Sequence, residues 1–189
     1  MFGWRRVVAA VLLLDCWTYF WHRLNHAVPL FWQFHRTHHS EMKMDVTSAS
    51  RFHIGEIIFS SLLRLPLIIL LGVRLKELVI YETLMFAVVQ FHHANINIPR
   101  FLENILRWII VTPNLHRVHH SRWMPETNSN FSSFLSIWDT LFDTRRWRDN
   151  AREIHFGLEG FDHPQHHTLT GLLQTPLPKT PETPEQAKG

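Results

Sequence analysis

The stretch that decides the fold is VVAAVLLLDCWTYFWHRLNH, residues 7–26, in which an apolar run leads into His22 and His26. The run itself covers residues 7–21, follows two arginines, and is interrupted only by Asp15. A secretory signal peptide also begins with a basic segment and an apolar core, but it ends at a small-residue cleavage site. Here aromatic residues continue into the histidines instead. We therefore predict a membrane-embedded helix whose polar end carries histidines.

Two further apolar runs, residues 54–72 and 75–91, are joined by a short turn. Each is near the minimum length of a helix that spans a bilayer, so a helical hairpin is predicted, either transmembrane or re-entrant. Glu56, Arg64 and Glu82 lie inside these runs. Charges in such positions usually face the protein interior or reach the membrane interface.

The rest of the chain is more polar. Residues 28–50 are predicted to form a helix that leaves the membrane. Residues 100–111 have apolar positions at helical spacing and charges opposite, which is typical of an interfacial amphipathic helix and equally of a core helix. Residues 112–173 resemble a soluble cap, and residues 174–189 form a Pro-rich tail expected to be disordered. The predicted fold is all-α: one membrane-embedded domain over residues 1–173, with the hairpin and a cytoplasmic, histidine-lined helical cap.

Composition narrows the possible functions. The chain has 189 residues, a formal net charge of +3 and a single cysteine, Cys16. One cysteine excludes a disulfide framework, and also an iron–sulfur centre or Cys-based zinc finger made by this chain alone. Arginine dominates the basic residues, yet no nucleic-acid motif contains an arginine cluster, so acidic lipid headgroups are a better match than nucleic acid. The anomaly is histidine, with 15 residues.

Ten histidines fall into four clusters: HRLNH (22–26), HRTHH (35–39), HH (92–93) and HRVHH (116–120). Residues i, i+3 and i+4 share one helix face, so each H-x2-HH is expected to direct three imidazoles at one point. Imidazole binds iron, zinc, copper and nickel. A metal site is therefore predicted. The other five histidines lack this spacing and are expected to be ordinary polar residues: His53, His155, His163, His166 and His167.

The number of histidines indicates more than one ion. Zinc is satisfied by four ligands, whereas eight to ten convergent imidazoles fit two six-coordinate ions with positions left for water or oxygen. Soluble di-iron bundles use Glu-x-x-His pairs, which this sequence lacks.

The chain resembles the fatty acid hydroxylase/sterol desaturase superfamily. The resemblance covers about residues 15–144 and is carried by these segments: DCWTYFWHRLNH, FHRTHHS, HHANI, TPNLHRVHHS and ETNSNFSSFLSIWDTLFDT. The last segment is similar to the Asn-Tyr-Gly and Trp-Asp-x-Leu-Phe-Gly-Thr signature of that family. Phe131-Ser132 stands where the family has Tyr-Gly, and Asp143 where it has Gly; both departures are expected to alter a turn rather than the metal site.

The resemblance implies a set of metal ligands: His22, His26, His35, His38, His39, His93, His116, His119 and His120. His92 is a possible further ligand. Asp15 lies about two helical turns before His22 and is expected either to orient a ligand imidazole or to pair with an arginine. Relatives carry further membrane helices before the first histidine box. Only fourteen residues precede Asp15 here, so a short form or a truncated reading frame is expected.

The activity implied is that of an O2-dependent di-iron oxygenase that hydroxylates or desaturates a lipid, with zinc able to replace iron on expression. No G-x-G-x-x-G fingerprint is present, so a separate reductase or electron carrier is expected. The alternative class is non-redox: a His-rich metal carrier, or a zinc hydrolase, although no HExxH motif supplies a general base. Basic residues around the histidine boxes predict that the boxes face the cytoplasm.

Overall fold

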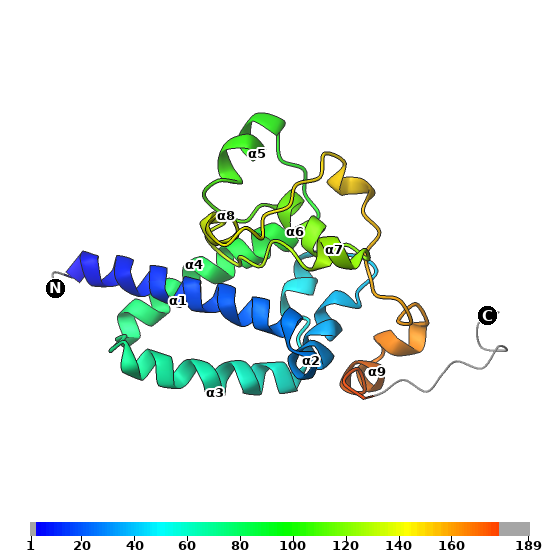
Figure 1. Ribbon diagram of the computed structural model, residues 1–189, viewed down its shortest axis with the longest axis horizontal. Coiled ribbons are helices and arrows are strands. Elements are labelled where there is room, and N and C mark those ends of the chain that lie inside the picture. The colour runs from blue at the N-terminus through cyan, green and yellow to red at the C-terminus, as the bar shows by residue number, and fades with distance from the viewer. Residues whose placement is uncertain (1–2, 178–189) are drawn as a thin grey trace.

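The computed structural model describes residues 3–177, and its regular elements are all helices (Figure 1). Its elements are α1 (Gly3–Ala27), α2 (Pro29–His39), η1 (Val46–Ser50), α3 (Ile54–Leu70), α4 (Leu75–His93), α5 (Arg100–Leu106), α6 (Pro113–His119), α7 (Met124–Thr127), α8 (Ile137–Leu141), η2 (Ala151–Glu153), η3 (Pro164–His167) and α9 (Leu169–Leu173). In this described part, β-pairing is limited to two isolated bridges. The predicted all-α fold is confirmed.

The long helix α1 runs through the middle of the molecule and packs against α2 and α4. Among residues 3–177, it is the one helix that is both long and apolar enough to cross a membrane. The other two apolar runs form α3 and α4, of 17 and 19 residues. By the same measure neither qualifies as a span. The second and third runs therefore form helices, as predicted, but only the first has the properties of a complete crossing.

Helices α3 and α4 form the predicted hairpin, with the turn at Gly72 at the opposite end of the molecule from α2 (Figure 1). Gly72 has φ of 61°, a left-handed conformation that glycine adopts without the steric cost of a Cβ atom. An ion pair between Arg64 of α3 and Glu82 of α4 links the two helices. Two of the three charges inside the apolar runs are thus paired with each other, and the third, Glu56, is buried in the protein interior.

Two predicted helices are shorter than the sequence indicated. The segment 28–50 contains α2, which ends at His39, and the separate short helix η1, whose capping residue Asp45 accepts a hydrogen bond from the backbone N–H of Thr47. The amphipathic segment 100–111 is helical only to Leu106.

The second of these helices stops early because its last residues pair with a distant segment. Ile110 forms an isolated antiparallel bridge with Leu135, and the N–H of Val111 donates to the carbonyl of Phe134 at 3.0 Å. These contacts bring the segment before α8 beside the end of α5. Sequence periodicity reports only local helical preference and carries no signal for such non-local pairing.

The C-terminal residues of the described range cover α2. Arg36 donates hydrogen bonds to the carbonyl oxygens of Thr175 and Leu177, and Thr175 is buried. Residues 174–177, the beginning of the predicted disordered tail, therefore make defined contacts. The rest of that tail, residues 178–189, lies outside the described residues.

Candidate metal centre

Nine histidines converge at the end of α1 in two adjacent groups. Group one contains His22 and His26 from α1, His35 and His39 from α2, and His119 from α6. Group two contains His38 from α2, His93 from α4, His116 from α6, and His120 at its C-cap. Within each group the ligand nitrogens all lie within 4.8 Å of one another. All nine predicted ligands are thus brought together.

Each H-x2-HH motif is divided between the two groups, which corrects the expectation that its three imidazoles meet at one point. In α2, His35 and His39 belong to group one and His38 to group two. In α6, His116 and His120 belong to group two and His119 to group one. Residues i and i+4 differ by about 40° around a helix, whereas i+3 and i+4 differ by about 100°. The imidazole at position i+3, that of His38 or His119, therefore points at the neighbouring group.

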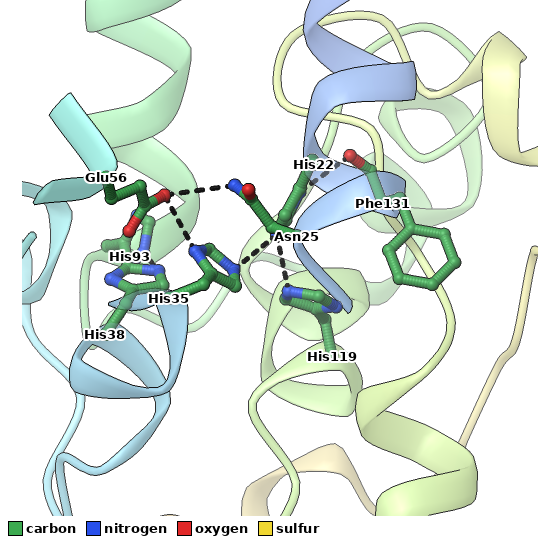
Figure 2. Close-up of polar contacts among 8 residues, drawn as sticks. All are labelled: His22, Asn25, His35, His38, Glu56, His93, His119 and Phe131. Carbon is green, nitrogen blue, oxygen red and sulfur yellow. Dashed lines mark hydrogen bonds and ion pairs between the residues drawn. The ribbon is translucent and has the colours of Figure 1, made fainter. Parts of the chain in front are cut away.

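Backbone carbonyl groups fix the orientation of several imidazoles. His22 Nδ1 donates to the carbonyl of Phe131 at 2.8 Å (Figure 2). His119 Nδ1 donates to the carbonyl of Ser129 at 2.7 Å. In group two, His93 Nδ1 donates to the carbonyl of Val89 at 2.8 Å. A carbonyl oxygen only accepts, so each Nδ1 carries the proton. The Nε2 atom of each neutral ring then carries no proton and has a free lone pair.

These lone pairs face one another. His22 Nε2 lies 3.0 Å from His119 Nε2 and 3.1 Å from His35 Nε2. Two lone pairs cannot form a hydrogen bond, so this arrangement is repulsive unless a cation lies between them. For a metal–nitrogen distance of about 2.1 Å, neighbouring ligands at right angles are about 3.0 Å apart. The spacing fits adjacent positions around a six-coordinate ion.

Other buried nitrogens of group one have no hydrogen-bond partner within the described residues. They are Nε2 of His26 and both ring nitrogens of His39. An unsatisfied buried polar atom costs about 1–3 kcal/mol, which a metal–nitrogen bond would offset. The donor set, the lone pairs and these nitrogens together fit the predicted metal ions.

The protein holds imidazoles of α2 and of the segment around α6 neutral. Burial lowers the pKa of His119 to about 3. Burial, followed by repulsion from neighbouring imidazoles, also lowers the pKa values of His39, His116 and His120 well below the usual range. Only the neutral form offers a lone pair to a metal, so these shifts keep the ligands available at neutral pH.

Metal retention and stability are expected to fall together below about pH 6.5. The pKa of these histidines is lower in the folded chain than in the unfolded chain, where it is about 6.5. Acid therefore adds protons mainly to the unfolded state, and the free energy of unfolding decreases as pH falls through that value. Metal content and thermal midpoint after dialysis at stepped pH values measure this. Equal values at pH 7.5 and at about pH 5.5 would contradict it.

Glu56 is a site residue that sequence reasoning missed. Its Oε1 accepts a hydrogen bond from His35 Nδ1 at 2.8 Å and another from Asn25 Nδ2 at 3.1 Å (Figure 2). Glu56 is buried in the first turn of α3, and a carboxylate in this position orients the ring and increases its basicity. The available signal was an acidic residue at the start of an apolar run.

The change Glu56→Gln is expected to weaken metal binding at group one by about 10- to 100-fold, because the amide is a poorer acceptor for His35. Metal titration by competition with a chelator measures the affinity. Glu82→Gln, on the same hairpin but paired with Arg64, is the matched control and should leave the affinity unchanged. Equal affinities in the parent and Glu56→Gln would refute a ligand-orienting role.

Asp15 has a different role from the two that were expected. Its Oδ2 accepts hydrogen bonds from the backbone N–H of Leu135 at 3.0 Å and from Trp138 Nε1 at 2.7 Å. Its hydrogen-bond partners are thus neither a histidine nor an arginine. Asp15 instead ties the segment around α8 to the middle of α1, because it lies two turns too early to reach the imidazoles.

The remaining histidines divide as the spacing predicted, with His92 between the two classes. His92 is buried, and its ring centroid lies 3.9 Å from that of His116, yet it belongs to neither group. His53 instead caps α3, where its Nδ1 accepts from the N–H of Gly55. His155, His163, His166 and His167 also lie outside both groups.

Phe131 corrects the expectation that both departures from the family signature affect only turns. Its ring centroid lies 5.1 Å from that of His26, and its carbonyl holds His22. Phe131 therefore forms part of the wall of group one. Asp143 does occupy a turn: its φ is 54°, the left-handed conformation for which glycine is preferred.

A cavity of about 550 Å³ adjoins both histidine groups and lies among α1, α3 and α4. At the metal end it is lined by His22, His35, His38, His92, His93 and His116. The rest of its wall combines apolar and aromatic residues with polar ones. The apolar and aromatic residues include Trp17, Trp21, Phe52, Ile57, Met85, Phe86 and Val89, and the polar ones include Ser60, Ser61, Arg64, Glu82 and Gln90. Its volume is in the ordinary range for small-molecule sites. The cavity can thus bring an apolar chain to the imidazoles.

Several known proteins are similar to this chain in sequence. It is 32% identical over 155 residues to ornithine lipid hydroxylase OlsE of Rhizobium tropici, covering 82% of this chain and 46% of that protein. It is 34% identical over 134 residues to alkylglycerol monooxygenase of Xenopus tropicalis, and 31% identical over 158 residues to that of Homo sapiens. These alignments cover 69% and 82% of this chain, but 28% and 33% of the two relatives.

The chain thus spans less than half the length of these relatives, and no solved structure matches it. The family model for fatty acid hydroxylases matches residues 7–144, which include all nine convergent histidines. Together with the two histidine groups at the end of an apolar helix, this match shows that the chain belongs to the fatty acid hydroxylase family.

Proposed function

We propose that this chain carries the catalytic centre of a membrane-bound, iron-dependent oxygenase that hydroxylates a lipid. The observation that carries the proposal is the cavity, whose partly apolar walls end at imidazoles of both groups. Relatives named as a lipid hydroxylase and as monooxygenases favour hydroxylation over desaturation. Sterols, fatty acyl chains and alkylglycerols are the substrate types we consider.

The nine histidines of the two groups would hold two iron ions. When bound, iron supplies the power to activate O2 and oxidise a C–H bond. The chain's own contribution is positioning: the carbonyls of Phe131, Ser129 and Val89, and the carboxylate of Glu56, keep the Nδ1 protons away from the site. The apolar cavity walls would align the lipid and exclude water from the reacting carbon.

Electrons are proposed to come from a separate protein. The sequence has no dinucleotide fingerprint, and its single cysteine excludes an iron–sulfur relay made by this chain alone. Purified protein supplied with NADPH, O2 and lipid should therefore not turn over. Addition of a reductase with a small iron–sulfur or haem electron carrier should restore turnover. Turnover with NADPH alone would refute an external electron supply.

A second candidate is a non-redox protein, either a zinc hydrolase or a metal carrier, because imidazole also binds zinc. The near-octahedral nitrogen spacing and the lipid-sized cavity favour the oxygenase.

We also propose that the histidine groups face the cytoplasm, since arginines surround them in the sequence. Impermeant labelling of cysteines placed at Leu75 and Glu159, in a Cys16→Ser background, tests this orientation: only the cysteine at Leu75 should react from outside.

The deciding experiment combines metal analysis with oxygen chemistry. The chain is purified without oxygen, loaded with ferrous iron, and supplied with reduced carrier and membrane lipid extract under isotopically labelled O2. We expect close to two irons per chain and one labelled oxygen atom in a lipid alcohol. Zinc at both groups, with no oxygen uptake after iron loading, would overturn the proposal in favour of the non-redox class.

A further inference from the structure

An exposed apolar surface lies on the side of the cap remote from α2, where it serves no part of the metal centre. We call it the cap edge. Its members come from α5, the residues just after it, and α8: Phe101, Leu102, Ile105, Trp108, Ile109, Ile137 and Leu141. Six of the seven are more than half exposed. Large contiguous apolar surfaces of this kind mark a site of interaction.

Backbone contacts bring the two parts of the cap edge together. The N–H of Ser136 donates to the carbonyl of Ile109 at 3.3 Å, and the Ser136 hydroxyl donates to that of Arg107 at 2.8 Å. The bridge between Ile110 and Leu135 continues this pairing. Residues after α5 therefore lie beside residues before α8, although nearly thirty positions separate them in the sequence.

Arginine and tryptophan alternate at this edge. The guanidinium of Arg145 lies 4.0 Å from the centre of the Trp108 ring, and that of Arg107 lies 4.4 Å from the centre of the Trp147 ring. Tryptophan is enriched at the level of lipid headgroups, and arginine there attracts anionic lipids. Protein interfaces are also enriched in tryptophan and arginine, so the choice of a lipid partner depends on where this edge lies relative to α1.

The cap edge also lies at the depth that a bilayer around α1 would reach. Asp15, at the middle of α1, accepts hydrogen bonds from Leu135 and Trp138, at the start of α8. Exposed apolar residues on α1 extend from Val8 to Leu24, about 24 Å of helix, and so pass this level. A membrane that covers the exposed face of α1 therefore meets the cap edge as well.

We propose that the cap edge is a membrane-docking surface, with its apolar side chains below the headgroups and its arginine side chains extended toward anionic headgroups. The inference rests on the membrane placement in the proposed function. An amphipathic surface of this kind is expected to enter the interface by about 5–10 Å. Docking there would fix the cap, and with it α6 and its histidines, relative to the bilayer that supplies the lipid.

The test uses the full chain in phosphatidylcholine vesicles, with or without phosphatidylglycerol. Single cysteines that carry an environment-sensitive fluorophore replace Ile109 or Leu141 in a Cys16→Ser background. Met124→Cys, also an exposed apolar residue of the cap, is the matched control, and Leu13→Cys on α1 reports membrane insertion. Metal content equal to the parent's shows that each variant is folded.

We expect the labels at positions 109 and 141 to be quenched by lipid-borne nitroxide at least about threefold more than the label at position 124, with the reverse order for aqueous iodide. Phosphatidylglycerol should increase lipid quenching at position 109, and Arg107→Gln with Arg145→Gln should remove that increase.

Lipid quenching at position 13 but not at 109 and 141 would overturn this inference alone. Water access at position 13 would overturn the membrane placement itself. Protection of positions 109 and 141 from both quenchers would assign the surface to a second copy or another protein. Quenching at position 109 that does not respond to phosphatidylglycerol would refute the role of the arginines.

Discussion

Replacement of His119 by alanine is expected to lower the metal content from about two ions per chain to about one, and His120→Ala is expected to do the same at the other group. His119 belongs to group one and His120 to group two, although they are adjacent in sequence. Each substitution removes an imidazole from a buried site, so hydroxylation should fall by more than about 100-fold in both. Elemental analysis and product formation measure the two effects.

The double variant should retain almost no metal, because each group then lacks a ligand. His163→Ala is the control, since this histidine lies outside both groups and should leave metal and activity unchanged. His93→Ala should be more damaging than His92→Ala, because only His93 belongs to a group. A chain that binds one metal, and keeps it after loss of His35 or His38, would contradict the two-ion centre.

The second large effect is expected for Asp139→Asn. The Asp139 carboxylate accepts hydrogen bonds from the backbone N–H groups of Phe131 and Ser132, at 2.7 and 3.0 Å, and from the Thr144 hydroxyl at 2.7 Å. An amide replaces one acceptor oxygen by a donor and leaves a buried N–H group unpaired. The free energy of unfolding should fall by about 3–5 kcal/mol.

The damage should extend to group one, because the loop held by Asp139 presents the carbonyls of Ser129 and Phe131 to His119 and His22. Thermal unfolding and metal titration follow the two consequences. Asp149→Asn is the matched control: this exposed residue accepts only from Trp147 Nε1, and the change should cost less than about 0.5 kcal/mol. Equal stability of both variants would show that Asp139 does not support the loop.

The histidines could be identified from sequence because helical spacing is a local property. Spacing predicts which imidazoles share a helix face, whereas the set of nine ligands, His93 included, followed from the resemblance to the family. It does not report how one face is shared between two neighbouring centres. The assignment of His38 and His119 to the opposite group from their box partners therefore required the relative placement of α2 and α6.

The supporting contacts were less predictable because they connect distant parts of the chain. Glu56 reaches His35 across 21 positions, and Asp15 reaches Trp138 across 123. An acidic residue in an apolar run indicates that a partner exists but not which one it is. The early end of α5 has the same origin, since Ile110 leaves the helix to pair with Leu135. The turn at Asp143 could be recognised only because the family has glycine at this position.

The division of each histidine box has a consequence for how the ions exchange. Helix α2 supplies two imidazoles to group one and one to group two, whereas α6 with its cap residue does the reverse. Each helix would therefore contact both of the proposed ions, and a rotation that frees one ion would also displace a ligand of the other. Escape of either ion would then be slowed by its dependence on movement of a shared backbone element.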